Sequence, residues 1–253
     1  MKLVKIAVVL LVIGGLLTTV AFVMAFTTAE VQRHTSTITL PEKPDTVFMA
    51  IDHTEEGFVY PRPWFSQKIF YFHVPVGLAS FLVFGVAAFF SIRFLMTRRR
   101  EYDTKSRIAM ETTLVFVVLT MITGVIWTRA AWGVWWQWEP RLTTYFIMTL
   151  MIIAYFVLRN SIEDEERRAV YAAAYSCIAV INAPISFAVT RLIPSASHPV
   201  VDEGAMAVSN LIPFLVAMAG MLMVGFAIYV ARMTEERLGE RLAALKEKFE
   251  SGL

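Results

Sequence analysis

Six long runs of apolar residues, separated by charged or polar segments, dominate the chain. They span residues 4–26, 69–92, 108–128, 142–158, 169–190 and 211–231. Each run approaches the ~20 residues that a helix needs to cross ~30 Å of hydrocarbon. We therefore predict an all-α polytopic membrane protein with six transmembrane helices, organised as a single membrane domain over residues 1–253.

The charged residues support this segmentation. The chain is 57% hydrophobic and 17% charged, whereas a typical soluble domain is about 25% charged. Among the 23 Lys and Arg and the 21 Asp and Glu residues, only Lys5 and Glu111 fall inside the runs. Glu111 lies near one end of its run, where we expect it to reach the interface or the basic segment that precedes it.

Basic residues are distributed unevenly between the two sides that the runs define. The side that holds both termini and the segments 93–107 and 159–168 carries 16 Lys and Arg, and the opposite loops carry seven. The positive-inside bias therefore predicts cytoplasmic termini. The first run is longer than the apolar part of a signal peptide, which favours a retained helix. The segment 234–250 places apolar residues on one helical face, which predicts an amphipathic cytoplasmic tail.

Several kinds of chemistry are disfavoured by composition. Cys177 is the one cysteine, so the chain has no intramolecular disulfide and no Cys-x-x-Cys motif. It carries neither a Walker loop nor a G-x-G-x-x-G motif. A net charge of +2 does not indicate the strongly basic surface that binds nucleic acid, and we expect no nucleic-acid partner.

Tryptophan is concentrated in one predicted outer loop, residues 127–141. Five of the six tryptophans fall between Trp127 and Trp138. An interfacial aromatic belt would spread tryptophan over both membrane surfaces, so we favour a flat aromatic platform for a large, planar, apolar ligand. In this interpretation Gly133 allows close approach of the backbone, while Arg129 and Arg141 pair with anionic groups on the ligand's rim.

Two of the four histidines are candidate ligands. His34 and His53 lie in a polar outer loop and are interpreted as solvated residues. His73 lies inside the outer end of the second run, where an ionisable side chain is a functional candidate, although a packing histidine is an alternative. His198 precedes the sixth run on the same predicted side. Two neutral imidazoles beside an aromatic platform are typical of a bis-histidine haem site, whereas zinc would need three or four ligands close together.

Two segments carry a family resemblance. Residues 132–143, Trp-Gly-Val-Trp-Trp-Gln-Trp-Glu-Pro-Arg-Leu-Thr, resemble the tryptophan-rich "WWD" signature of the haem-handling proteins of cytochrome c biogenesis. Residues 69–75, Ile-Phe-Tyr-Phe-His-Val-Pro, resemble the first haem-ligand segment of that family. With six spans and this length, the chain is most similar to the cytochrome c maturation protein C family, the haem exporter component of system I.

The resemblance implies a site and a function. It implies that His73 and His198 are the axial ligands of the haem iron, and that the haem is b-type and transiently bound. The implied platform residues are Trp132, Gly133, Trp135, Trp136, Trp138 and Arg141. Glu139 stands where the family usually has aspartate, which leaves open the contact of that carboxylate.

The resemblance also implies a place and partners. The protein is expected in the cell inner (cytoplasmic) membrane, with the haem site on its periplasmic face. The implied partners are a periplasmic haem chaperone of the cytochrome c maturation protein E type, a small single-span subunit, and the ATPase and membrane subunits of an ABC transporter.

We expect a haem-binding transfer or transport component rather than an enzyme. The sequence shows no nucleophile or acid–base pair that argues for bond making. Two alternatives remain: the haem-ligating subunit of a system II cytochrome c synthase, and a quinol-oxidising di-haem cytochrome. The latter would need two pairs of intramembrane histidines.

Overall fold

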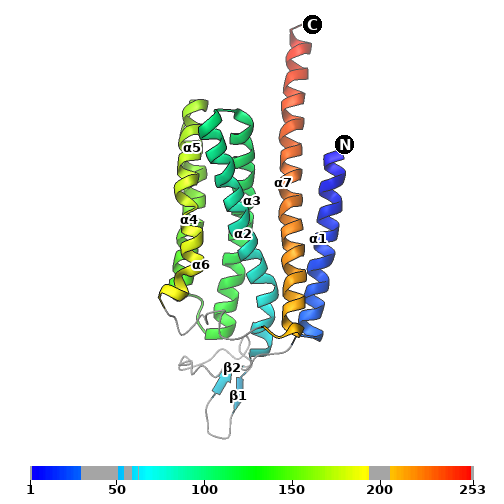
Figure 1. Ribbon diagram of the computed structural model, residues 1–253, viewed down its shortest axis with the longest axis vertical. Coiled ribbons are helices and arrows are strands. Elements are labelled where there is room, and N and C mark those ends of the chain that lie inside the picture. The colour runs from blue at the N-terminus through cyan, green and yellow to red at the C-terminus, as the bar shows by residue number, and fades with distance from the viewer. Residues whose placement is uncertain (1, 30–50, 54–58, 62, 194–205, 252–253) are drawn as a thin grey trace.

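The computed structural model is a bundle of long helices and describes residues 2–29, 51–53, 59–61, 63–193 and 206–251 (Figure 1). The helices are α1 (Lys2–Thr27), α2 (Pro63–Thr97), α3 (Arg100–Trp132), α4 (Pro140–Asn160), α5 (Glu165–Ala179), α6 (Asn182–Leu192) and α7 (Val208–Glu250). A short antiparallel pair, β1 (Ile51–His53) and β2 (Val59–Pro61), precedes α2 and was not predicted. Six spans in the described part are long and apolar enough to cross a membrane, which confirms the predicted fold class.

The fifth predicted span consists of two helices. α5 ends at Ala179 and α6 begins at Asn182, with a turn through Val180 and Ile181 between them. Proline has no backbone N–H, so Pro184 cannot donate to the carbonyl of Val180 four residues earlier. That carbonyl instead accepts a hydrogen bond from the N–H of Ala183, at 3.0 Å. The proline therefore accounts for the break.

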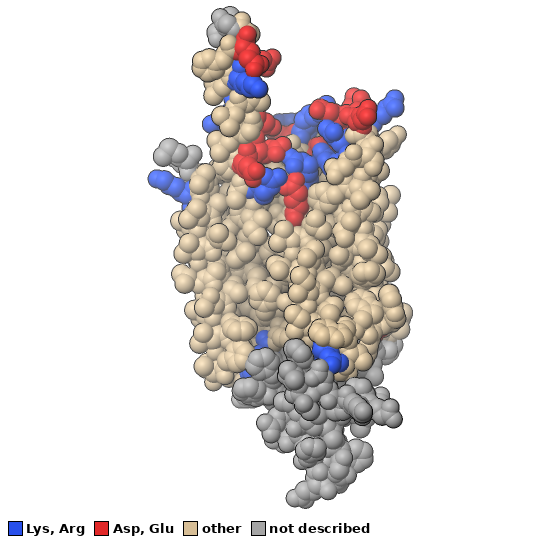
Figure 2. All heavy atoms as spheres, turned by 180° about the vertical axis from the view of Figure 1, so that it is seen from behind, with Lys and Arg blue, Asp and Glu red and all other residues tan. Residues whose placement is uncertain are grey.

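Charged side chains gather at one end of the bundle (Figure 2). The N-terminus of α1 and the C-terminus of α7 lie at this charged end together with the α2–α3 and α4–α5 connections (Figure 1). We call the other end, where α3 is followed by α4, the tryptophan end. The shared placement of the termini agrees with the predicted topology, and their cytoplasmic location stays a prediction.

Ion pairs join the helices near the charged end. Arg159 of α4 donates to both carboxylate oxygens of Asp103 of α3, at 2.7 and 2.6 Å. Both side chains are nearly buried, with 11% and 12% of their surfaces exposed. Glu111 contacts Arg107, as expected for the neighbouring basic segment, and also Arg232 of α7. These pairs keep charge inside the bundle because each buried group has an opposite charge beside it.

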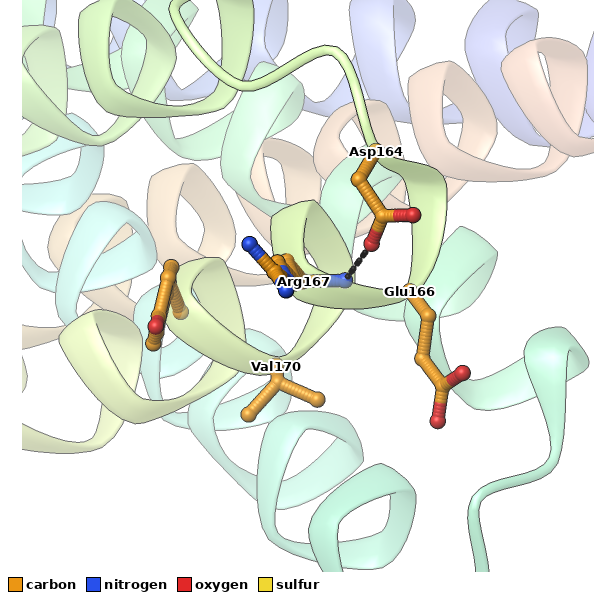
Figure 3. A pocket seen from close by; sticks show the side chains of 5 residues that line it. Asp164, Glu166, Arg167 and Val170 are labelled. Carbon is orange, nitrogen blue, oxygen red and sulfur yellow. Dashed lines mark hydrogen bonds between the residues drawn. The ribbon is translucent and has the colours of Figure 1, made fainter.

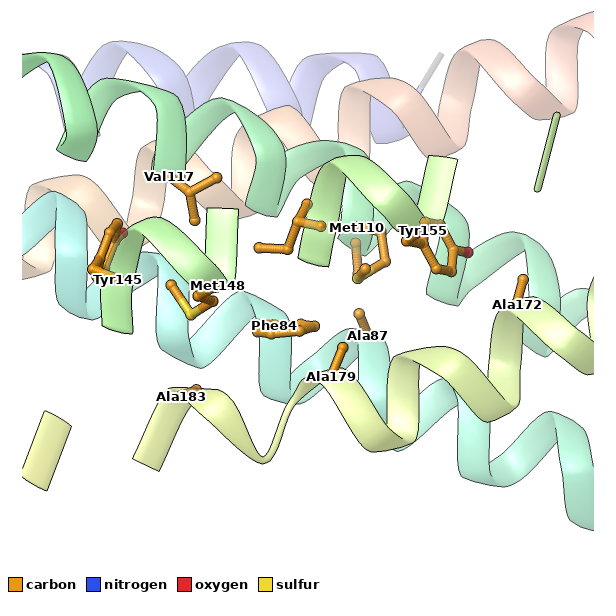
Figure 4. Packing of buried hydrophobic residues seen from close by; sticks show 12 residues of the cluster. Phe84, Ala87, Met110, Val117, Tyr145, Met148, Tyr155, Ala172, Ala179 and Ala183 are labelled. Carbon is orange, nitrogen blue, oxygen red and sulfur yellow. The ribbon is translucent and has the colours of Figure 1, made fainter. Parts of the chain in front are cut away.

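The main core fills the space between α2, α3, α4 and the α5–α6 pair (Figure 4). Large side chains such as Phe84, Met148 and Tyr155 interdigitate there with alanines of α5 and α6. Hydroxyl groups also cross between helices: Ser80 of α2 and Tyr145 of α4 share a 2.8 Å hydrogen bond. α2 therefore occupies the centre, with α3, α5, α7 and α1 all packed against it.

α1 is attached mainly through α7, and small residues make that contact possible. A Cβ atom on Gly14 would lie 2.8 Å from the carbonyl oxygen of Gly220. A Cβ atom on Gly220 would lie 2.6 Å from the hydroxyl of Thr18. Glycine lets two helix backbones approach this closely, as in other small-residue crossings within membranes.

This crossing generates a stability prediction. Replacing Gly14 by leucine should force α1 away from α7 and lower the melting temperature of the detergent-purified protein, because overpacking costs about 1–3 kcal/mol. Gly15→Leu is the matched control, since a Cβ atom there meets nothing within 4 Å. Equal melting temperatures for the two variants would contradict the close crossing.

Candidate functional site

His73 lies on α2, ten residues after the helix begins at Pro63, and points toward α3. Its Nδ1 atom is 2.9 Å from the hydroxyl oxygen of Thr123. That hydroxyl in turn donates to the carbonyl of Leu119, at 2.8 Å. The hydroxyl of Thr123 therefore links the imidazole on α2 to the backbone of α3 and fixes the orientation of the ring.

The ring of His73 is also held by the shape of α3. Trp127 packs edge-on against it, with ring centroids 5.4 Å apart and ring planes at 77°. A Cβ atom on Gly124 would lie 3.0 Å from Cε1 of the imidazole. The absence of a side chain at Gly124 therefore makes room for the ring. Trp127 lies where the predicted span 108–128 and the predicted outer loop 127–141 overlap, and the structure places it within α3, facing α2.

The segment between α3 and α4 contains only residues 133–139, shorter than the predicted loop of 127–141. It begins at Gly133, which adopts a left-handed conformation with φ 73° and closes α3 through its N–H to the carbonyl of Arg129, at 3.1 Å. Such a conformation is unfavourable for residues with a Cβ atom. The structure thus shows a capping role for Gly133, and its role in ligand approach stays a prediction.

The tryptophans of this segment differ in exposure. Trp135 and Trp138 are 55% and 74% exposed, whereas Trp132 and Trp136 are partly buried. Trp136 packs edge-on against Trp138 at 80° and against Phe146 of α4 at 68°. Trp136 and Trp138 therefore do not share a plane, and the flat surface expected from the sequence is not formed by these two rings. They form an angular aromatic surface instead.

Both predicted arginines lie at this end and already contact the protein. The guanidinium of Arg129 donates to the carbonyl of Gly133 and lies 5.5 Å from the ring centroid of Trp135. Arg141 reaches the carbonyl of Phe187 in α6, at 3.4 Å. Arg129 thus supports the tryptophan segment, and Arg141 connects the start of α4 to α6.

Glu139 is the N-cap of α4. Its Oε1 atom accepts a hydrogen bond from the N–H of Leu142, at 2.5 Å, and Pro140 occupies the first helical position. The side chain is 8% exposed. Aspartate and glutamate can both present a carboxylate oxygen to the first turn of a helix, which gives a structural reason for an acidic residue at this position.

His198, His34 and the side chains of His53 and Trp64 lie outside the described residues. Two other polar residues at the tryptophan end escaped sequence analysis. Lys68 is 4% exposed and donates to the carbonyl of Ala29 at 2.9 Å, while the hydroxyl of Tyr71 donates to Asn210 at 3.2 Å. They hold the start of α2 against α1 and α7. Only their own burial in the folded protein, at 4% and 6% exposure, distinguishes them from ordinary interfacial residues.

Pockets lie at both ends of the described part of the bundle. A groove between α1, α2 and α3 is lined by Phe22, Ile69, Phe72, Thr123 and Ile126, and so adjoins the hydroxyl that holds His73. The other pocket lies at the charged end, at the start of α5 (Figure 3). There Asp164 accepts from the N–H of Arg167 at 2.8 Å, so this carboxylate is a helix cap. Within the described ranges no three His, Cys, Asp or Glu side chains gather.

These features define a class of protein: a polytopic helical membrane protein with one oriented histidine and exposed tryptophans at the same end of the bundle. The Heme exporter protein C family model matches residues 62–248. A Heme exporter protein C of Bradyrhizobium diazoefficiens is 31% identical over 185 residues, which cover 72% of this chain and 70% of that protein. The chain therefore belongs to the Heme exporter protein C family.

Further relatives agree. A Heme exporter protein C of Paracoccus denitrificans is 28% identical over 197 residues, which cover 75% of this chain and 82% of the relative. A mitochondrial protein of Marchantia polymorpha, whose name is ccmC-like and refers to cytochrome c biosynthesis, is 31% identical over 120 residues. That match covers 47% of this chain and 50% of the relative.

The cap geometry predicts how Glu139 responds to substitution. Glu139→Ala should lower the free energy of unfolding by about 1 kcal/mol, because the first turn of α4 loses its side-chain acceptor. Glu139→Asp keeps an acceptor and should stay close to the original stability. Thermal melting in detergent measures both variants, and a similar loss for alanine and aspartate would contradict the capping role.

Proposed function

We propose that this protein binds haem at the tryptophan end, between His73 and His198, and passes it to a periplasmic haem chaperone during cytochrome c biogenesis. Membership of the Heme exporter protein C family supports haem as the cargo. The observation that carries the proposal is the hydrogen bond between Nδ1 of His73 and Thr123. Histidines that ligate metals are commonly oriented by such a bond from the second ring nitrogen.

The depth of His73 adds support. An ionisable side chain within a membrane span is costly and is retained chiefly where it has a function. Because Nδ1 contacts Thr123, we propose that Nε2 is the nitrogen that ligates the iron. Thr123 and Gly124 set the direction of that nitrogen, since one binds the ring and the other leaves space for it.

The second axial ligand in this proposal is His198. It follows the last described residue after α6, Ile193, by five positions, and α6 ends and α7 begins at the tryptophan end (Figure 1). Because the two helix ends that flank His198 in the sequence both lie at the tryptophan end, we propose this histidine as the second ligand. We therefore assign His198 the opposite face of the iron.

Trp135 and Trp138 are proposed as the surface over which haem leaves. Their exposed rings offer apolar, rigid area to a porphyrin at little cost in side-chain entropy. Trp136 packs against Trp138, and Gly133 and Glu139 cap the helices on either side of this segment. We include Trp132 in the proposed haem surface. Arg129 and Arg141 carry the positive charge that would attract the haem propionates.

The proposed partners follow from the cargo and the family. The haem chaperone receives haem on the periplasmic side of the inner membrane, while a small single-span subunit and an ABC transporter complete the exporter. The protein acts in this scheme as a transport component and not as an enzyme. Family membership favours this role over the system II synthase subunit, which would instead produce thioether-linked cytochrome without a haem chaperone.

Absorption spectroscopy of the purified protein tests the haem site. The protein should copurify with haem that has a low-spin bis-histidine spectrum, and His73→Ala and His198→Ala should each lose haem or change to a high-spin spectrum. Thr123→Val should weaken haem binding by roughly 10–100-fold because the imidazole loses its orienting acceptor, whereas Thr123→Ser keeps it. A protein without haem, or histidine variants with unchanged spectra, would overturn the assignment.

Haem transfer to the purified chaperone tests the exit surface. Replacing both Trp135 and Trp138 by alanine should slow transfer by roughly tenfold or more, because the porphyrin loses stacking area worth about 1 kcal/mol or more per ring. Tyr171→Ala at the charged end is the matched control, since Tyr171 is also 55% exposed. Normal transfer by the tryptophan double variant would refute this role.

A further inference from the structure

The last part of α7 carries an exposed apolar stripe. Leu238, Leu242, Leu245 and Phe249 are 50%, 66%, 52% and 84% exposed. Their spacing of four, three and four residues is the alternation of a and d positions in a heptad, so all four side chains share one face. We call these four residues the tail stripe.

Ion pairs attach α7 to α3 directly before the tail stripe. Glu236, two residues before the stripe, contacts Arg107 of α3 at 2.6 Å, and Arg232 contacts Glu111 at 2.8 Å. Pro213 is the proline inside α7, and it lies far from the stripe. The helix therefore continues past the ends of its neighbours, as Figure 1 shows.

The direction of α7 disfavours a membrane as the occupant of the stripe. At 43 residues, the helix is about 64 Å long, roughly twice the thickness of the hydrocarbon core. Its second half thus lies beyond the bilayer if the first half spans it. An amphipathic helix binds a membrane when it lies in the plane of the interface, and this one is continuous with a spanning helix.

The charges beside the stripe indicate what kind of protein would bind. In the heptad register, Arg241, Lys246 and Lys248 occupy the flanking e and g positions, and Glu240 and Glu247 occupy f positions on the opposite face. The borders of the stripe are therefore basic. In a coiled coil, side chains at these borders meet those of the partner helix and determine which partner is accepted.

A second copy of the chain is a poor partner. In a parallel pair, Arg241 of one copy would face Lys246 of the other, and an antiparallel pair would also bring basic borders together. Such like-charge contacts act against pairing. A partner helix with an apolar seam would cover the tail stripe, and acidic residues at its borders would pair with the basic residues beside the stripe.

We propose that the tail stripe is a docking surface for an amphipathic helix of another protein, one with leucine-type residues at its a and d positions and Asp or Glu at its e and g positions. The C-terminal end of α7, which carries the tail stripe, lies at the opposite end of the bundle from the tryptophan end (Figure 1). The ion pairs of Glu236 and Arg232 with α3 hold α7 in place directly before the tail stripe.

Peptide binding to the full-length protein in phosphatidylcholine nanodiscs tests the proposal. The probe is a synthetic helix of about four heptads with Leu at a and d and Glu at e and g, and its twin carries Lys at e and g. The Glu peptide should bind at least roughly tenfold more tightly than the Lys peptide, and added salt should weaken it. Equal binding of both peptides, or no binding, would overturn the proposal.

Substitutions in and beside the tail stripe test whether it is the contact surface for the peptide. Leu242→Asn with Leu245→Asn should abolish binding of the Glu peptide, whereas Glu240→Ala with Glu247→Ala on the opposite face should leave it unchanged. Changing Arg241 and Lys246 to Glu should reverse the preference toward the Lys peptide. Binding that survives the leucine double variant, or that keeps its preference after charge reversal, would contradict the stripe as the contact surface.

A lipid-quenching measurement separates a membrane from a protein partner. A bimane label at Ala244→Cys, an exposed position next to the tail stripe, in a Cys177→Ser background reports the surroundings of the stripe in nanodiscs that contain phosphatidylserine. Brominated lipid should leave its fluorescence unchanged while the Glu peptide shifts it. Strong quenching by brominated lipid would assign the stripe to the bilayer surface and refute the proposal.

Discussion

The absence of water in the hydrocarbon core is the constraint on which the rest of this structure depends. A polar group there must find its partner within the protein. Thr112, Thr113 and Thr120 of α3 accordingly donate to carbonyls one turn earlier, at 2.8–3.0 Å. Hydroxyl pairs such as Ser91 with Ser106 join α2 to α3 in the same way. The interior thus combines apolar packing with hydroxyl groups that are hydrogen-bonded within or between helices.

The same constraint makes the candidate site unusual among these contacts. Most hydroxyl groups of α3 are hydrogen-bonded to a backbone carbonyl of the same helix. The hydroxyl of Thr123 makes such a bond to Leu119 and also contacts Nδ1 of His73. The imidazole is thereby oriented by one helix while it is carried by another. A ligand that binds this ring therefore depends on the packing of α2 against α3, including the space beside Gly124.

The two ends of the bundle use polar groups differently. At the charged end, carboxylates and guanidinium groups pair between helices, as Asp103 does with Arg159, and so hold α3, α4 and α7 in place. At the tryptophan end, charged groups bind backbone atoms: Glu139 caps α4, and Arg129 reaches Gly133. The first arrangement fixes the helices relative to one another, and the second shapes a short segment with exposed rings.

The sequence by itself determined the number of spans, because helices that cross a membrane need long apolar runs that any window of residues reveals. It also determined that His73 is exceptional, since a single imidazole interrupts such a run, and that tryptophan is concentrated between α3 and α4. It did not determine the break at Val180, the extension of α3 to Trp132 or the length of α7.

Only the tertiary structure decided how these residues meet. The partnership of His73 with Thr123, the capping role of Glu139 and the perpendicular rings of Trp136 and Trp138 depend on contacts between separate elements or on local dihedral angles. Hydropathy depends only on the kind of side chain at each position. It therefore carries no information about contacts between separate elements or about local dihedral angles. The apolar pattern therefore specifies which segments enter the membrane, while packing between helices specifies which side chain each polar group contacts.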